Sequence, residues 1–378
     1  MEKIICICSK GHKLMKSVQI TDSNGERIFM INNIILEDIE YIIKNINIKK
    51  CEGKSFFITG ANGFLARYMV EVLVYLNEYV LNEKCKIIAL CRNKADAYIK
   101  FKEYLNREYF NLIFQRVEDK IEYSDNVDYI IHAASRANTK EFGINPVGVL
   151  SANVIGTYRL LEYAKTKDII SFLFFSSGAV YGNANEAKEF IKETQFYSLD
   201  PLDIRSCYAE SKRMGENMCF SYYKQFNIPT KIIRISHTYG PGINLKDGRV
   251  FSDFVNSILN NEDLVIKSDG KAKRPFCYIS DAIIAFFLVL FKGKNGEVYN
   301  MSNNKCFLSI NDLAHILVEK TFLEKDLKVT NNINDTEVRS TDKAQVSVDI
   351  SKIKDLGWNP KIGIEEGFKR TVESFQIN

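Results

Sequence analysis

The stretch "SFFITGANGFLARYMVEVLVYL", residues 55–76, constrains the fold more than any other part of the chain. An apolar run of strand length leads directly into Gly60 and Gly63, and a long apolar segment with helical spacing follows. Glycine allows the backbone to turn tightly between the two elements. A strand that enters a helix through so short a turn is typical of a strand-helix-strand unit, whose second strand lies parallel to the first.

Later segments repeat the same alternation of apolar strands and helices. Apolar stretches of strand length occur at residues 86–91, 127–135, 171–182 and 230–236, with helical segments between them. Strands of this kind lie in a parallel sheet that helices cover on both faces. The sequence therefore predicts an α/β fold with a Rossmann-type, doubly wound parallel sheet. After about residue 235 the strands become shorter and the loops longer, which indicates a smaller lobe that closes over a ligand.

The chain divides into three predicted parts. Residues 1–50 form an N-terminal extension, with a hairpin around Asn24-Gly25 and a helix that packs on the main domain or on a second subunit. Residues 51–234 form the dinucleotide-binding domain, and residues 235–378 form mainly a substrate-binding lobe, with some chain returning to the first domain. The predicted N-terminal helix has one apolar face, made by Ile39, Ile42, Ile43 and Ile46.

Composition excludes several classes of protein. The net charge is only +4 over 378 residues, and no basic run with interleaved aromatics occurs, so we expect no nucleic-acid partner. The nine cysteines are scattered without metal-ligand spacing, which favours reduced thiols and no metal. The longest apolar run, "AIIAFFLVLF" at 282–291, suits a buried helix and is too short to span a membrane. We expect a cytoplasmic protein without a membrane partner.

The glycine turn predicts a dinucleotide site. Gly60 and Gly63 would let the backbone approach a pyrophosphate at the helix N-terminus, and Ala66 is small enough for close packing of helix on strand. NAD enzymes usually place a carboxylate at the end of the second strand, where this sequence has "LCRN" with Arg92 and Asn93. Because Arg92 suits a 2′-phosphate, the sequence slightly favours NADP over NAD.

A tyrosine and a lysine four positions apart predict the catalytic pair. Tyr208 and Lys212, in "CYAESKRMGE", would lie on the same face of a helix. A phenol has a pKa of about 10 in water and is a poor base at neutral pH, but a neighbouring cation favours the phenolate. Tyr208 is therefore a candidate for proton transfer to and from a substrate hydroxyl.

Seven ordered segments over residues 53–375 resemble the extended short-chain dehydrogenase/reductase family, in its nucleotide-sugar epimerase and dehydratase branch. The segments are "TGANGFLA", "DYIIHAAS", "NVIGTYRLLEYA", "FFSSGAVYG", "YAESK", "RISHTYGPG" and "RPFCYISD". The resemblance implies a Rossmann domain for the dinucleotide and a C-terminal lobe for a nucleoside-diphosphate sugar. It also implies a homodimer.

The resemblance assigns roles to residues one by one. It implies that Tyr208 transfers the proton, that Lys212 binds the nicotinamide ribose and lowers the pKa of Tyr208, and that Ser177 orients the substrate hydroxyl. It implies a cofactor-binding set of Gly60, Asn62, Gly63, Phe64, Leu65, Arg92, Asn93, Ala133, Ala134, Asn153, Tyr208 and Lys212. It implies a substrate-binding set of Ser135, Ser177, Tyr181, His237, Arg274 and Tyr278, with Arg274 on the diphosphate. Arg234 falls in a substrate-side segment, and His132 is expected to be a packed residue.

Two small residues after Ser177 separate the possible reactions. In the family, dehydratases carry Asp-Glu here and decarboxylating members carry Glu at the second position, whereas this chain has Gly178 and Ala179. Elimination then lacks its usual acid and base. The sequence therefore favours an epimerase that removes and returns hydride at a sugar carbinol. The alternative is an NADPH-dependent reductase of keto sugars, and a decarboxylase or a non-catalytic dinucleotide-binding protein is less favoured.

Overall fold

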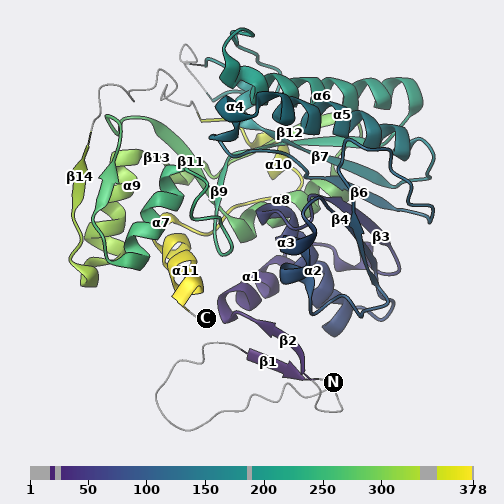
Figure 1. Ribbon diagram of the computed structural model, residues 1–378, viewed down its shortest axis with the longest axis horizontal. Coiled ribbons are helices and arrows are strands. Elements are labelled where there is room, and N and C mark those ends of the chain that lie inside the picture. Colours follow the sequence, from purple (N-terminus) through teal and green to yellow (C-terminus); the bar gives the residue numbers. More distant parts are fainter. Residues whose placement is uncertain (1–17, 22–26, 185–189, 333–346, 377–378) are drawn as a thin grey trace.

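The computed structural model describes residues 18–21, 27–184, 190–332 and 347–376, and a seven-stranded sheet forms its centre (Figure 1). The strand order is β12-β8-β7-β6-β3-β4-β5, and every neighbouring pair is parallel. The strands are β3 Ser55–Thr59, β4 Lys86–Cys91, β5 Phe110–Phe114, β6 Tyr129–His132, β7 Ser171–Ser177, β8 Thr230–Ile235 and β12 Glu297–Met301. This sheet confirms the predicted Rossmann-type α/β fold.

Helices cover both faces of the sheet, as the unbroken apolar strands predicted. Helices α2 (Phe64–Tyr79) and α8 (Ile279–Lys292) lie on one face, and α5 (Pro146–Ala164) and α6 (Cys207–Phe226) lie on the other (Figure 1). Successive residues of a strand point to opposite faces. In β3, Phe56 and Ile58 accordingly join the core under α2 and α8, whereas Phe57 joins the core under α5 and α6.

The order of the strands reverses between β3 and β6. From β3 the chain proceeds outward through β4 to β5, and from β6 it proceeds outward the other way through β7 to β8. In open parallel sheets, ligands bind at the carboxyl ends of the strands where the order reverses. The glycine turn at Gly60 follows β3, and Ala134 follows β6, so both lie at this crevice.

The chain after β8 builds smaller sheets beside the central one. Three strands pair in the order β13-β11-β9, and two more pair as β10-β14. Strand β12 departs from this pattern, because it returns to the central sheet and pairs with β8. The bounds are β9 His237–Tyr239, β10 Leu264–Ile266, β11 Lys273–Tyr278, β13 Phe307–Ser309, β14 Val329–Asn331, α7 Val250–Asn260, α9 Ile310–Ile316, α10 Ser351–Lys354 and α11 Ile364–Gln376.

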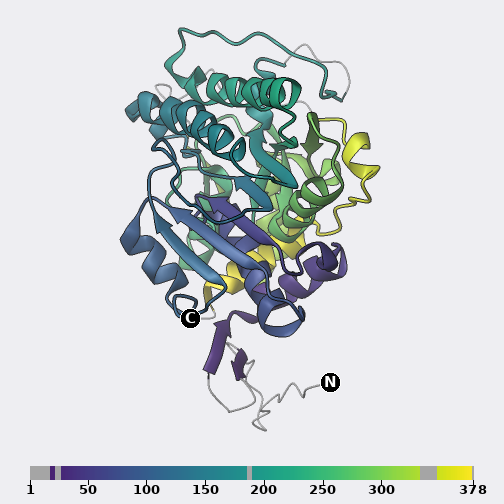
Figure 2. The same ribbon diagram turned by 90° about the vertical axis from the view of Figure 1, so that its right-hand side faces the viewer.

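The N-terminal segment contributes a hairpin and a helix. Strand β1 (Val18–Thr21) pairs antiparallel with β2 (Arg27–Ile31), and the expected turn at Asn24-Gly25 lies outside the described residues. Both views show this hairpin beyond the rest of the described chain (Figure 2). Helix α1 (Asn33–Lys44) follows and buries Ile39 and Ile42 completely. It packs near α2, α8 and α11, so the N-terminal helix is part of the main core.

Candidate active site

The turn between β3 and α2 has the shape of an anion-binding cradle. Gly60 has a φ of +63°, and a Cβ at this position would lie 2.8 Å from the Cα of Ala134. The Gly63 N–H donates to the carbonyl oxygen of Gly60 at 2.8 Å and closes the turn. Gly63 also caps α2 without any side-chain hydrogen bond, so ligand atoms can reach the first N–H groups of the helix. These residues therefore fit the pyrophosphate of a dinucleotide.

Tyr208 and Lys212 lie one turn apart near the start of α6. The Lys212 side chain is buried, and its Nζ donates to the carbonyl oxygen of Phe175 at 2.7 Å. The same Nζ lies 5.9 Å from the centre of the Tyr208 ring. Burial lowers the pKa of Lys212 to about 7, although the nearby Cys219 and Glu216 partly oppose the shift. The lysine is thus poised between its charged and neutral forms at neutral pH.

Ser177 completes the catalytic arrangement from the end of β7. Burial raises the pKa of Tyr208, and hydrogen bonding from Ser177 together with the charge of Arg249 only partly opposes this increase. The ring of Phe142 stacks on Tyr208 with the ring centres 4.9 Å apart, which fixes the plane of the phenol. The structure brings together the three residues that the sequence predicted as catalytic.

Polar residues beneath this trio have packing roles. Asn153 donates to the hydroxyl of Ser211 at 2.9 Å, and Ser211 donates to the Tyr208 carbonyl. Asn153 therefore supports the helix that carries the lysine. His132 bonds Thr59 and Thr157, and burial followed by the charge of Lys212 lowers its pKa to about 3. His132 is neutral at physiological pH and packed in the interior, as expected.

Arg249 is a site residue that the sequence analysis missed. It precedes α7, its Nε donates to Asp247 at 2.6 Å, and its charge acts on both Tyr208 and His237. Burial first, and then Arg274 and Arg249, lower the pKa of His237 to about 3. The charges of two arginines thus act on His237, which is neutral at physiological pH. The only sequence signal was an arginine in "DGRV", which resembles an ordinary loop until the fold brings it beside Tyr208.

Ser135 lies near the glycine turn with an unused hydroxyl. It follows β6, one residue after Ala134, whose backbone meets the turn at Gly60. Its Oγ is buried and has no hydrogen-bond partner among the described residues. A buried polar atom without a partner is costly unless a ligand or water satisfies it. The Ser135 hydroxyl is therefore available to a ligand, and its role in substrate binding stays a prediction.

Tyr181 does not lie where the sequence analysis expected it, in contact with substrate. Its hydroxyl donates to Asn300 at 2.6 Å and accepts from Arg234 at 2.9 Å. Arg234, which also fell in a substrate-side segment, is buried and pairs with Glu216 at 2.7 Å. Tyr181 and Arg234 therefore belong to an internal network that joins the turn after β7 to β8, β12 and α6. Among the described residues, these partners occupy the Tyr181 hydroxyl and the Arg234 guanidinium.

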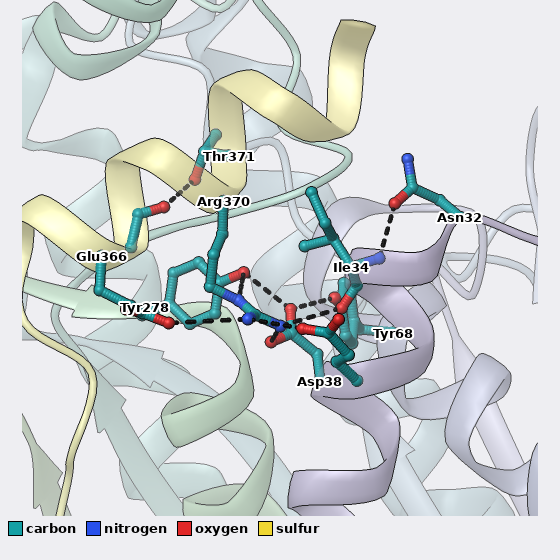
Figure 3. Close-up of polar contacts among 10 residues, drawn as sticks. Asn32, Ile34, Asp38, Tyr68, Tyr278, Glu366, Arg370 and Thr371 are labelled. Atoms are coloured by element: carbon teal, nitrogen blue, oxygen red, sulfur yellow. Dashed lines mark hydrogen bonds and ion pairs between the residues drawn. The ribbon is translucent and has the colours of Figure 1, made fainter. Parts of the chain in front are cut away.

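Tyr278 is the second correction to the predicted substrate site. Its side chain is fully buried, and its hydroxyl donates to Asp38 Oδ2 at 2.7 Å (Figure 3). Tyr68 donates to the same oxygen at 2.8 Å, and Arg370 pairs with Asp38 Oδ1 at 2.9 Å. We call Asp38, Tyr68, Tyr278 and Arg370 the Asp38 cluster. No short sequence pattern could indicate this cluster, because Tyr278 and Asp38 are 240 residues apart.

The predicted adenosine side of the crevice is more exposed. Arg92 is exposed, and the side chain of Asn93 caps α3 (Lys94–Phe101) by accepting from the Asp96 N–H at 3.1 Å. Phe64, Leu65 and Ala133 pack partly buried against the main core. A small pocket of about 50 Å³ lies beside the turn, where Asn62, Phe64 and Gly242 meet Ile35 of α1.

The described residues show neither a metal centre nor a membrane span. No group of three or more His, Cys, Asp or Glu side chains among them is arranged to hold a metal ion. In the same residues, no helix has the length and apolarity needed to cross a bilayer. The seven cysteines in these ranges are free thiols, and Cys6 and Cys8 lie outside them.

Comparisons with known proteins agree with this geometry. Residues 56–302 match the model of the NAD dependent epimerase/dehydratase family. UDP-glucuronic acid decarboxylase 6 of Arabidopsis thaliana is 32% identical over 85% of this chain and 88% of its own length. dTDP-D-glucose 4,6-dehydratase of Bos taurus is 28% identical over 86% and 89%. The structure of UDP-glucose 4-epimerase from Thermotoga maritima, solved with UDP-glucose, superposes with a TM-score of 0.73 at 25% identity, covering 85% of this chain and 98% of that chain.

Proposed function

The chain belongs to the NAD-dependent epimerase/dehydratase family, and from this premise we propose that it oxidises a sugar carbinol of UDP-glucuronic acid and releases carbon dioxide. The observation that carries the proposal is the similarity to UDP-glucuronic acid decarboxylases over most of both chains, in a protein that brings Tyr208, Lys212 and Ser177 together. The epimerase prediction was based on the segment "SSGAVYG", in which Gly178 and Ala179 replace the carboxylates. The similarity to decarboxylases therefore moves decarboxylation ahead of it.

The residues of the site divide the work of the first step. NAD held at the turn of Gly60 and Gly63 would supply the acceptor and later the donor of the carbinol hydride. Tyr208 takes the proton of the carbinol hydroxyl, and Ser177 holds the same oxygen. Lys212 in its charged form favours the phenolate of Tyr208. Arg249 supplies a second positive charge beside the phenol.

Loss of carbon dioxide needs no base at C5, but a proton must be supplied to C5 afterwards, and Ala179 stands where decarboxylating members of the family carry Glu. Oxidation at C4 creates a carbonyl that is β to the C6 carboxylate. The C5–C6 bond then breaks, and its electrons move to the carbonyl oxygen that Ser177 and Tyr208 hold. A proton is added at C5 and the carbonyl is reduced again, so the sum consumes one proton and gives a UDP-pentose and carbon dioxide. Dehydration instead needs an acid and a base beside Ser177, where Gly178 and Ala179 supply neither.

Epimerisation at the same carbon remains the second candidate. Its support is the absence of a carboxylate at Gly178 and Ala179, together with the likeness to a UDP-glucose 4-epimerase. Around Gly178 the site is open, since a Cβ there would meet only the Ile235 carbonyl oxygen at 3.9 Å. The reductase alternative depends on Arg92 and predicts consumption of added NADPH.

One substrate separates these reactions. We would incubate the protein and NAD⁺ with UDP-glucuronic acid labelled with carbon-13 at C6, and follow the label by NMR. Decarboxylation transfers the label to carbon dioxide and bicarbonate and leaves a UDP-pentose. Retention of the label in a C4-inverted uronic acid would identify an epimerase instead. Tyr208→Phe is the matched control, because it removes one hydroxyl and should bind the same ligands without turnover.

A further inference from the structure

The end of β4 cannot recognise the adenosine ribose in the usual way. NAD enzymes of this fold place a carboxylate there, which accepts hydrogen bonds from the ribose hydroxyls. Here the position is Cys91, whose thiol is buried against the glycine turn. Burial raises its pKa to about 11, and the backbone N–H groups of Asn62 and Ala61 act on it. A neutral buried thiol gives the ribose no charged acceptor.

A carboxylate reaches the same turn from the next element along the chain. Asp96 lies in the first turn of α3, and its Oδ2 accepts from the Asn62 side chain at 2.6 Å. Lys100, one turn later, pairs with the same oxygen at 3.0 Å and donates to the Asn62 carbonyl at 2.9 Å. The three residues form a closed ring beside the glycine turn. This ring fixes the Asp96 carboxylate at the predicted adenosine side of the crevice.

The other oxygen of Asp96 is available to a ligand. Within the part of the chain that the structure describes, Oδ1 of Asp96 has no hydrogen-bond partner, and the side chain is 37% exposed. Arg92 differs, because it lies in solvent and forms no hydrogen bond or ion pair within the same residues. Asp96 and Lys100 are paired with each other through Oδ2. What the pair leaves open at the turn is therefore a carboxylate acceptor, Oδ1, and not a cation.

We propose that Asp96 selects NAD over NADP by accepting a hydrogen bond from the adenosine ribose and repelling a 2′-phosphate. This inference depends on the proposed function only in requiring a dinucleotide at the glycine turn. A phosphate monoester carries a charge of about −1.5 to −2 at neutral pH, so a carboxylate beside it is unfavourable. The proposal for Asp96 reverses the preference for NADP over NAD that the sequence analysis based on Arg92.

The test measures dissociation constants of NAD⁺ and NADP⁺ by isothermal titration calorimetry on nucleotide-free protein, without substrate. The wild type should bind NAD⁺ at least about tenfold more tightly than NADP⁺, the lower end of what a charged hydrogen bond contributes. Asp96→Asn keeps an acceptor and removes the charge, so it should tighten NADP⁺ by about tenfold and change NAD⁺ little. Asp96→Ala should weaken NAD⁺ by about tenfold.

Two further variants serve as controls. Glu108→Gln removes an exposed negative charge from the same half of the domain and should leave both dissociation constants unchanged. Arg92→Ala should also leave the ratio unchanged. Circular dichroism melts confirm that each variant is folded.

The outcomes separate the two proposals. A wild type that prefers NADP⁺, with the preference lost in Arg92→Ala, would overturn the assignment to Asp96. Equal shifts of NAD⁺ and NADP⁺ in Asp96→Asn would do the same, because they would show that the carboxylate only braces the turn. Failure of the folded wild type to bind either dinucleotide would overturn the proposed function together with this inference.

Discussion

Two tyrosines with different partners distinguish the candidate active site, where Tyr208 is half-buried, from the Asp38 cluster, where Tyr278 is fully buried. Tyr208 bonds a neutral serine and has the cations Lys212 and Arg249 nearby, whereas Tyr278 donates to the carboxylate of Asp38. Burial raises the pKa of both phenols. At Tyr208, Ser177 and the charge of Arg249 oppose this increase, whereas at Tyr278 the Asp38 carboxylate adds to it and Arg370 opposes it only in part. The charge of the partner therefore separates a phenol that can exchange its proton from one that holds the structure together.

The two regions also differ in whether their buried cation is paired with a carboxylate. In the Asp38 cluster, Arg370 pairs with Asp38 at 2.9 Å and with the more exposed Glu37 at 2.9 Å. In the candidate active site, Lys212 bonds only the carbonyl oxygen of Phe175 among the described residues. Breaking a buried ion pair destabilises the fold, and burying a charge without a partner also costs free energy. Lys212 is thus a residue whose placement favours chemistry at the expense of stability.

The largest expected effect separates the two tyrosines. Tyr208→Phe should lower turnover by about 10² to 10⁴, because it removes the proton-transfer group and little packing. Tyr278→Phe should leave turnover within about threefold and lower the free energy of unfolding by about 1 kcal/mol, the value of a typical hydrogen bond. Steady-state kinetics and urea unfolding measure both variants. Equal losses of turnover would show that the comparison between the tyrosines is wrong.

The next effect concerns the paired cation. Arg370→Met should lower the free energy of unfolding by about 3 kcal/mol, because Asp38 would remain buried without its charge partner. Chemical denaturation without bound nucleotide measures the change. Lys369→Met is the matched control, since Lys369 is the exposed neighbour on the same helix. A loss no larger than that of the control would mean that the Asp38 cluster contributes little to stability.

Removing the unpaired cation, Lys212, should stabilise the protein instead of destabilising it. The pKa of Lys212 is lowered to about 7, so below that pH the folded protein buries a charge that the unfolded chain exposes to water. Lys212→Met should raise the free energy of unfolding by about 1 kcal/mol at pH 6 while abolishing most turnover. In the wild type, the same group makes stability rise as pH increases from about 7 towards 10, since the unfolded state binds more protons there. Destabilisation by Lys212→Met at pH 6 would contradict this interpretation.

The smallest expected effect is a pH dependence in the Asp38 cluster. Burial, outweighing the opposing effects of Arg370 and the two tyrosines, raises the pKa of Asp38 to about 6 from 3.8. The folded state then binds more protons than the unfolded state between these values, so this group makes stability fall as pH rises from about 4 to 6. Asp38→Asn should remove this part of the slope. Urea unfolding at a series of pH values measures it, and an unchanged slope would show that Asp38 is ionised throughout.

The features that the sequence predicted correctly are those that depend on residues close together in the chain. The glycine turn at Gly60, the pair Tyr208 and Lys212, and the strands of the central sheet are each encoded in a short continuous stretch. Their geometry follows from local backbone rules, which a pattern can capture. The closing of the turn against Ala134 and the hydrogen bond from Ser177 then follow from the parallel order of the strands.

The errors and omissions concern residues whose partners are distant in sequence. Tyr181 and Tyr278 stood in substrate-side segments, but Asn300 and Asp38 engage their hydroxyls from 119 and 240 residues away. Arg249 was missed for the same reason, because only the folded chain brings its charge to Tyr208. A polar side chain in a segment does not reveal whether it faces a ligand or an internal partner.

The contact between α1 and α11 also sets an order of events during synthesis. Asp38 leaves the ribosome 332 residues before Arg370, the cation that pairs with it. At elongation rates of about 5 to 20 residues per second, the carboxylate waits roughly 15 to 70 s for its partner. During that interval α1 can pack on α2 only if the Asp38 carboxylate is buried without its cation or becomes protonated. The face of the sheet itself is covered by α2 and α8, so the step that we expect to wait for the last helix is the docking of α1 on α2 and α8.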